Sequence, residues 1–138
     1  MQLKRDTEYA LRILYAVAGK SDPEEGAFRS GATLSEISAL SGVPRVGIDR
    51  ICGQLEAAGL IISRKNGGGD VSYTASPELL RKSLLDVVRV MEQGVPLFAV
   101  FDRASDFFSQ NEARLLRLQA KTESLLDGET LGEYFSGG

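Results

Sequence analysis

The sequence predicts a mainly α-helical fold with a small β wing, namely a winged helix-turn-helix domain followed by a long C-terminal helix. Two short helix patterns are joined by a turn of three or four residues, as in a helix-turn-helix. Two strand patterns around a glycine-rich tip follow directly, and a long amphipathic helix pattern ends the chain. We expect residues 1–94 to form the winged domain, and residues 95–138 a linker and dimerisation helix packed with it as one compact unit.

The composition limits the classes of protein to consider. The chain of 138 residues suits one domain with its own hydrophobic core. Because it shows no membrane-span or signal-peptide pattern, we expect a cytoplasmic protein. One cysteine and no histidine exclude an internal disulfide and leave zinc without a plausible ligand set. No acid–base or nucleophile constellation is present, so we expect neither an enzyme nor a bound cofactor.

The first helix of the motif is predicted to begin at Thr33. Thr33 and Glu36 are three residues apart, so a hydroxyl and a carboxylate can each satisfy a free backbone N–H of the first turn. Gly42 then supplies the backbone freedom of a tight turn. The apolar residues between them recur at helical spacing: Leu34, Ile37 and Leu40.

Residues 44–58 are predicted to form the recognition helix, and residues 60–75 the wing. Pro44 fits the first turn of a helix, and Gly59 fits its end. Strand patterns at 60–63 and 70–74 enclose the glycine-rich tip. No Gly-Lys-Ser/Thr sequence leads from these glycines into a helix, so a phosphate-binding loop is not supported. The inward-facing residues of the recognition helix are predicted to be Ile48, Ile51, Cys52 and Leu55.

The opposite side of this helix is predicted to face DNA. Arg45, near the helix start, can reach a guanine edge or a phosphate. Asp49 can accept a hydrogen bond from a cytosine amino group, or it can form a salt link with Arg45 or Arg50, and both readings stay open. The residues expected to contact DNA are Thr33, Ser35, Arg45, Val46, Asp49, Arg50, Gln54, Arg64, Lys65 and Asn66.

The distribution of charge bears on DNA binding, because the net charge is −3. Lys and Arg are in surplus in residues 1–20 and 43–65, whereas the acidic surplus lies mostly elsewhere. Local charge matters more than the total, since phosphate contacts are short-ranged at physiological salt. The weak basic surplus predicts modest non-specific affinity.

The first helix of the chain is predicted from Asp6 to Ala18. Its apolar surface is broad enough to be buried against both the winged domain and a partner chain. Its basic residues can touch the DNA backbone or lie in solvent: Lys4, Arg5 and Arg12.

Two features offer alternatives for sensing. Cys52 is either a redox-active thiol or a small buried hydrophobe, and its position on the apolar stripe favours the buried reading. Residues 95–108 hold four phenylalanines, which either line a pocket for a small-molecule effector or pack the last helix against the core: Phe98, Phe101, Phe107 and Phe108.

The C-terminal half is predicted to contain three capped helices. Ser83 with Asp86 begins one that ends at Gly94, and Thr130 begins a final turn. Ser109 to Glu112 is predicted to cap a long helix that ends at about residue 126 and pairs with its copy in a homodimer. Four residues of its stripe are expected at that interface: Leu115, Leu118, Thr122 and Leu125.

Several segments of the chain, taken in their order and spacing, carry a resemblance to a known family, although no single motif is diagnostic. The segments are Tyr9-Ala10-Leu11-Arg12, Leu34-Ser35-Glu36-Ile37, Leu55-Glu56-Ala57-Ala58-Gly59-Leu60-Ile61, the glycine-rich wing, and Ser83-Leu84-Leu85-Asp86-Val87-Val88 followed by Glu92. On these segments the chain resembles the Rrf2 family of winged helix-turn-helix transcription regulators from Met1 to Leu131. The resemblance implies a dimeric bacterial transcription regulator, and we expect a repressor that reads a pseudo-palindromic DNA operator.

The chain also departs from this family. Iron–sulfur members draw three cysteine ligands from the region matching residues 95–108, where this chain has none, so no cluster is expected even though Glu8 matches an acidic ligand position. Gly47 replaces a large residue, often tyrosine, and Lys65 matches a basic wing residue that enters the minor groove. The alternatives are a redox or small-molecule sensor using Cys52 or residues 95–108, and a dimeric interaction protein that has lost tight DNA binding.

Overall fold

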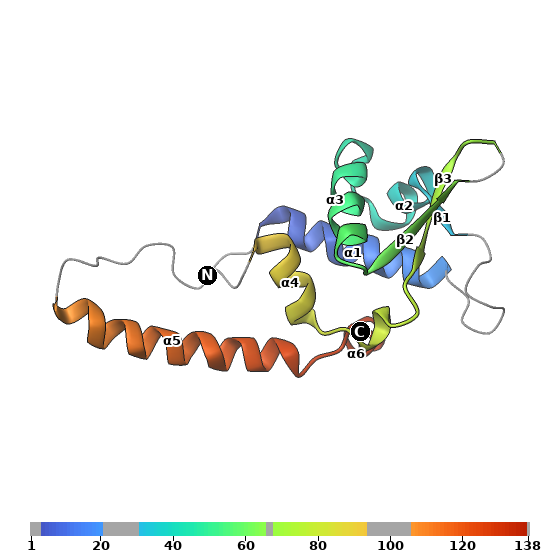
Figure 1. The fold of residues 1–138 in the computed structure, drawn as a ribbon. Coiled ribbons are helices and arrows are strands. Elements are labelled where there is room, and N and C mark those ends of the chain that lie inside the picture. Colours follow the sequence, from blue (N-terminus) through green and yellow to red (C-terminus); the bar gives the residue numbers. More distant parts are fainter. Residues whose placement is uncertain (1–3, 21–30, 66–67, 94–105, 138) are drawn as a thin grey trace.

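A central helix, α1 (Arg5–Lys20), organises the fold (Figure 1). The computed structural model describes residues 4–20, 31–65, 68–93 and 106–137, and of residues 20 and 106–112 it describes the backbone alone. In Figure 1, α3 lies on one side of α1 and α6 on the other, while the long helix α5 runs beside α4 at the edge of the molecule. The fold is a mainly helical winged helix-turn-helix, as the sequence predicts.

Helix α1 is buried because its apolar residues cover more than half of its circumference. Ala10, Ile13, Leu14 and Val17 are fully buried, and Tyr9 and Leu11 pack against the same core. Helix α1 therefore packs against the helices and strands around it. Full burial of an isoleucine, leucine or valine side chain contributes about 1.5–3 kcal/mol.

The helix-turn-helix consists of α2 (Leu34–Ser41) and α3 (Arg45–Ala57). The predicted capping box is present, because the Glu36 backbone N–H donates to Thr33 Oγ1 at 3.2 Å and the Thr33 N–H donates to Glu36 Oε1 at 3.4 Å. Gly42 ends α2 in the left-handed region, with φ of 71°. Leu40 lies in the last turn of α2 beyond the core, and its side chain is 58% exposed.

The wing is formed by β2 (Ile61–Lys65) and β3 (Val71–Ala75), which pair antiparallel from Ile61 with Ala75 to Lys65 with Val71. Both strands begin one residue later than predicted. Strand β2 does so because the Leu60 N–H still bonds back to the Leu55 carbonyl of α3. A third strand, β1 (Ala32–Thr33), pairs with β3 and was not predicted. A strand of only two residues is too short to show the alternation of apolar and polar residues that predicts a strand.

After the wing, a 3₁₀ turn (Leu79–Arg81) leads into α4 (Leu84–Glu92). Its predicted capping box is present, with the Ser83 N–H donating to Asp86 Oδ2 at 3.0 Å. Helix α4 ends at Gln93, whose φ of 57° places it in the left-handed region. Gly94, predicted as the helix end, lies outside the described residues.

The long helix α5 extends from Asp106 to Asp127. The predicted start at Ser109 is wrong, because the helix begins three residues earlier and Ser109 lies inside it. Ser-x-x-Glu also occurs inside helices, so this pattern alone does not locate a helix start.

The chain then returns to the winged domain through α6 (Leu131–Ser136). The Leu131 N–H donates to the Lys82 carbonyl at 2.8 Å, and the Leu84 N–H donates to the Glu129 carbonyl at 2.9 Å. The Leu131 side chain is fully buried in the core. Among the helices of the described residues, none is long and apolar enough to cross a membrane.

Candidate nucleic-acid interface

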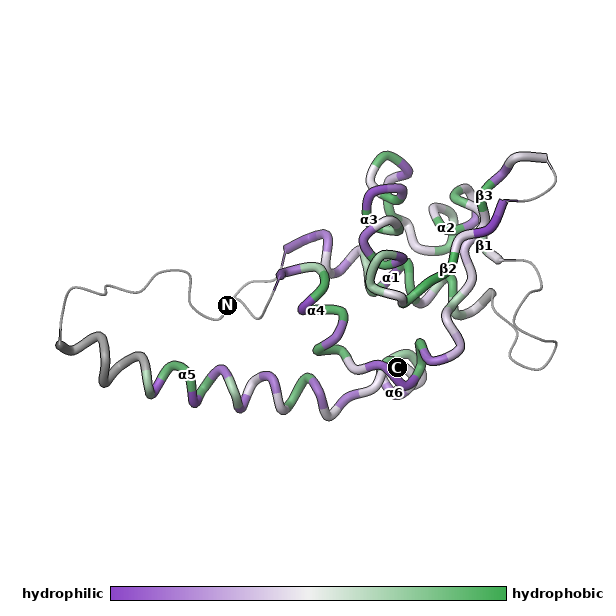
Figure 2. The backbone as a smooth tube through the Cα atoms, viewed as in Figure 1, coloured by the Kyte–Doolittle hydropathy of each residue, from purple (hydrophilic) through white to green (hydrophobic). Residues whose placement is uncertain are grey.

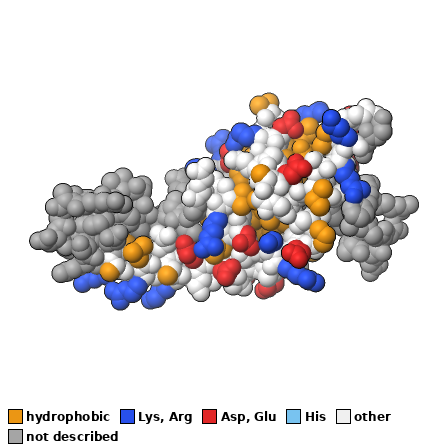
Figure 3. All heavy atoms as spheres, viewed as in Figure 1, with side chains coloured by type: hydrophobic (Ala, Val, Ile, Leu, Met, Phe, Trp, Pro, Cys, Tyr) orange, Lys and Arg blue, Asp and Glu red, His pale blue; other side chains and the backbone are white. Residues whose placement is uncertain are grey.

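Helix α3 presents one apolar and one polar side, and only the polar side is open to solvent. Its apolar residues are fully buried against α1 and α2, as predicted: Ile48, Ile51, Cys52 and Leu55. The opposite side is solvent-exposed and bears Arg45, Val46, Asp49, Arg50 and Gln54. In Figure 3, Lys and Arg side chains gather at this upper end of the molecule, with acidic side chains among them.

An ion pair ties the recognition helix to α1. Arg50 Nη1 lies 2.7 Å from Asp6 Oδ2, and this hydrogen bond holds the pKa of the Asp6 carboxyl below its usual value. Arg50 is therefore drawn towards α1, away from Asp49. Asp49 makes no ion pair with any residue that the structure describes, so the link to Arg45 or Arg50 that was one of its two readings is not formed.

The wing is fastened to the end of α3 by a contact that the sequence analysis missed. Glu56, in the last turn of α3, accepts a hydrogen bond from Ser63 Oγ at 2.6 Å and from the Ser63 backbone N–H at 3.3 Å. Polar residues seven apart across a helix end carry no recognisable pattern. This contact fixes the strand that carries Arg64 and Lys65, which are both exposed. Asn66 lies outside the described residues.

Two other predicted contact residues lie at the start of α2. The Thr33 hydroxyl is occupied by the capping box, whereas Ser35 is exposed in the first turn. Ser35 is therefore better placed than Thr33 to donate to a phosphate.

Basic residues just before and within α1 also have partners. Lys4 donates its backbone N–H to Glu92 Oε1 at 2.5 Å, and its Nζ lies 3.9 Å from Glu92 Oε2. Arg12 pairs with Glu8 at 2.6 Å and lies over the Tyr9 ring. Sequence could have signalled the second pair, since Glu8 and Arg12 are four residues apart on one helix.

Cys52 lies in the hydrophobic core of the helix-turn-helix. Burial raises the pKa of its thiol to about 12, and the negative charges of Asp49 and Glu56 add to the shift. A thiol with this pKa remains protonated near neutral pH, and only the thiolate is a good nucleophile.

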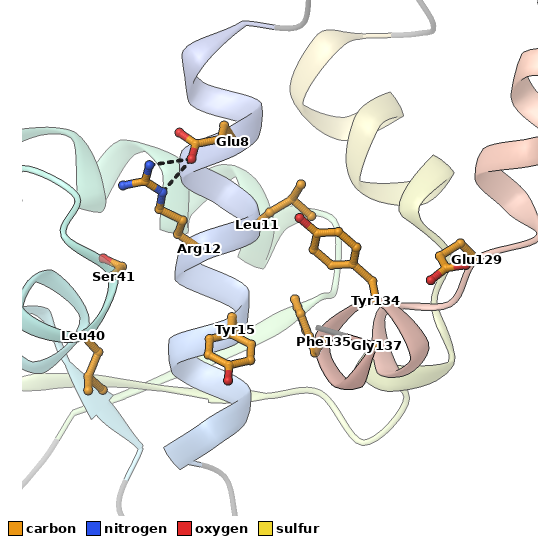
Figure 4. A pocket seen from close by; sticks show the side chains of 10 residues that line it. All are labelled: Glu8, Leu11, Arg12, Tyr15, Leu40, Ser41, Glu129, Tyr134, Phe135 and Gly137. Carbon is orange, nitrogen blue, oxygen red and sulfur yellow. Dashed lines mark hydrogen bonds and ion pairs between the residues drawn. The ribbon is translucent and has the colours of Figure 1, made fainter.

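A groove of about 580 Å³ lies between α1, the end of α2 and α6 (Figure 4). Its aromatic wall is formed by Tyr15, Tyr134 and Phe135, with the Tyr15 and Phe135 rings in an edge-to-face contact at 5.3 Å. The Glu8–Arg12 pair lies at its polar end. No sequence pattern predicts this groove, because α6 reaches α1 only in the folded chain.

Helix α5 leaves an apolar stripe uncovered. Leu118 and Leu125 are 52% and 78% exposed, and Leu115 and Thr122 are partly exposed beside them. The helix is fastened to α4 by Arg89, whose Nη2 lies 3.4 Å from Glu123 Oε2. Hydrophobic and hydrophilic residues alternate along α5 in Figure 2.

Comparison with known protein families identifies the family of this chain. Residues 3–134 match the model of the family described as Rrf2, iron-dependent transcriptional regulator. The chain belongs to the Rrf2 family. Rrf2 proteins are transcription regulators and not enzymes. This confirms the resemblance seen in the sequence and the expectation that the chain is not an enzyme.

Solved structures share the Rrf2 fold over the whole chain. CymR (YrzC), the global cysteine regulator of B. subtilis, is 19% identical, with a TM-score of 0.75 over 100% of this chain and 98% of that chain. The oxidized form of Staphylococcus aureus CymR is 18% identical, with a TM-score of 0.72 over 99% and 97%. T. potens IscR is 19% identical, with a TM-score of 0.71 over 99% and 88%. Among curated proteins, no sequence matches the chain.

The Rrf2 family description raises the question of iron, and the donor set of this chain does not fit an iron–sulfur cluster. Such clusters are held mainly by cysteine thiolates, and the chain has one cysteine and no histidine. That cysteine is buried in the core. Glu8, which matches an acidic ligand position, is paired with Arg12. Within the described ranges, no three residues of the metal-binding types are grouped together.

Proposed function

We propose that this Rrf2 protein is a sequence-specific, double-stranded DNA-binding transcription regulator that inserts α3 into the major groove. The observation that carries the proposal is the exposed polar side of α3, with the wing fastened beside it by Glu56 and Ser63. Recognition helices contact base edges with their N-terminal residues, which here are Arg45 and Val46. Lys65 ends strand β2 of the wing and is exposed, and we expect its basic side chain to reach the DNA backbone.

The proposal includes a homodimer that binds a pseudo-palindromic operator as a repressor. Helix α5 has 22 residues, and the exposed Leu118 and Leu125 are two turns apart on one side of it. Packing this stripe against a second copy would remove these side chains from water. A two-fold dimer then presents two copies of α3 to half-sites about one DNA turn apart.

The proposed regulator binds no iron–sulfur cluster. A dimer offers two cysteines, each buried beside Ile51 and Leu55, and Glu8 cannot replace the missing sulfur ligands. Anaerobic incubation with iron and sulfide should leave the protein colourless and free of stoichiometric iron. A stable visible chromophore that survives Cys52→Ala would overturn this part of the proposal.

DNA binding is tested by equilibrium titration of selected duplexes at several salt concentrations. Arg45→Ala should weaken binding to the preferred sequence by about 1–3 kcal/mol, since a bidentate base contact is lost. Lys65→Ala should weaken binding to all sequences alike and reduce the salt slope by about 1, since a phosphate contact is lost. Wild-type binding by both variants would show that the recognition surface is misplaced.

Assembly is tested by sedimentation of Leu118→Glu. The charge would be buried in the proposed α5 interface, so this variant should sediment as a monomer where the wild type is a dimer. The matched control is Leu40→Glu, an equally exposed leucine on α2 that should leave the dimer intact. An unchanged Leu118→Glu dimer would count against α5 as the interface.

The alternative functions have less support. The raised pKa of Cys52 argues against a thiol sensor. A small-molecule effector bound by residues 95–108 stays a hypothesis, because residues 95–105 and the side chains of Phe107 and Phe108 lie outside the described part of the chain. An interaction protein that has lost DNA binding would be favoured if no duplex from a random pool were enriched.

A further inference from the structure

Val46 is the most exposed large apolar side chain among the described residues. It lies in the first turn of α3 with 96% of its surface exposed. Such a side chain adds nothing to the hydrophobic core, and a β-branched residue is slightly unfavourable in a helix. The stability of the isolated chain therefore gives no reason for a valine here.

The surroundings of Val46 leave its two methyl groups clear of other atoms. The next residue, Gly47, has no side chain, and a Cβ built there would meet no atom within 4 Å. Arg50, one turn further along the same side, is held by Asp6 and so is drawn towards α1. The isopropyl group therefore projects from the N-terminal turn of α3, on the side proposed to face DNA.

We infer that Val46 reads the 5-methyl group of a thymine in the major groove, an assignment that rests on the proposed DNA-binding function. The thymine methyl is the apolar group that base pairs present in this groove, and the other base-edge groups are hydrogen-bond donors or acceptors. A valine pressed against those polar groups would displace water without replacing its hydrogen bonds. Because the Val46 side chain is stiff at χ1, little conformational entropy is lost on contact.

The test removes only the methyl group. A preferred duplex is first selected from a random pool with the wild-type protein. Each thymine is then replaced singly by deoxyuracil, which pairs in the same way but lacks the 5-methyl, and the Kd is measured at fixed salt. Replacement at one thymine position of a half-site should weaken wild-type binding about fourfold, as expected for loss of one buried methyl.

Two substitutions at Val46 assign this effect to the side chain. Val46→Ser removes both methyl groups and should bind the thymine and deoxyuracil duplexes equally at that position. Val46→Thr keeps one methyl and should retain most of the discrimination. Arg45→Ala is the matched control on the same turn, since it should bind less tightly yet still distinguish the two duplexes. Thermal unfolding of all variants should match the wild type, because both side chains are exposed.

The outcomes separate this inference from the proposed function. If the wild type binds a preferred duplex tightly but no thymine replacement weakens it, the methyl contact is absent and DNA binding stands. If Val46→Ser loses the same fourfold factor as the wild type, another residue reads the methyl and the assignment to Val46 is overturned. If no duplex is enriched, the proposed function fails and the assignment fails with it.

Discussion

Truncation of Leu131 tests whether α6 is part of the hydrophobic core of the winged domain. Leu131 follows the 22-residue helix α5, yet its side chain is fully buried, and its backbone N–H is hydrogen-bonded to Lys82. Leu131→Ala removes the buried atoms and leaves a cavity, which typically costs about 2–5 kcal/mol. This is a large part of the about 5–15 kcal/mol that stabilises an ordinary domain.

The assay is urea unfolding of wild type and variant at one protomer concentration, because dimerisation makes stability concentration-dependent. With a slope of about 2 kcal/mol per molar urea, the midpoint should fall by about 1–2.5 M. Leu40→Ala is the matched control, since the same atoms are removed from a side chain that is 58% exposed, and it should shift the midpoint much less. Equal, small shifts for Leu131→Ala and Leu40→Ala would refute the packing of α6 described above.

Three further predictions concern the recognition helix and its surroundings. The pKa of Asp6 is lowered in the folded state. Its ion pair with Arg50 should therefore increase the free energy of unfolding above the unfolded carboxyl pKa of about 4, and this increase should be lost as pH falls through the folded pKa. The free energies of unfolding of Asp6→Asn and wild type should therefore differ at pH 7, and the difference should shrink as pH falls below about 4. A difference that stays constant with pH would contradict the pair. Cys52 should react with a thiol reagent at pH 8 only as fast as the protein unfolds, and rapid labelling of the folded protein would contradict its burial. Gly42→Ala should destabilise the protein by about 1–2 kcal/mol, because φ at Gly42 is +71°. Gly47→Ala should stabilise it by about 0.5–1 kcal/mol, because Gly47 is helical and an added Cβ meets no other atom. Changes of the same sign in urea unfolding would contradict the backbone geometry.

The parts of the fold that sequence predicts well depend on local signals. The capping boxes at Thr33 and Ser83 and the tight turn at Gly42 lie within a few residues of chain, so their patterns are specific. The apolar stripe of α3 is equally local, and all four of its predicted inward residues are buried.

The parts that sequence did not predict depend on contacts between distant segments. Strand β1 exists only because β3 pairs with it, and α6 enters the core only because the chain folds back after α5. At the candidate site, exposure of Arg45 and Val46 follows from helical periodicity. The Asp6–Arg50 pair joins residues 44 apart, so no local sequence pattern predicts it.

Selection from a pool of random duplexes tests the central proposal most directly. The wild-type protein should enrich a two-fold-symmetric motif with half-sites about 10 base pairs apart, as expected for a homodimer that places α3 in successive major grooves. Arg45→Ala should enrich the same motif with relaxed preference at one base pair in each half-site. Failure of the wild type to enrich any sequence, or identical motifs and preferences from both proteins, would contradict recognition of DNA by the exposed side of α3.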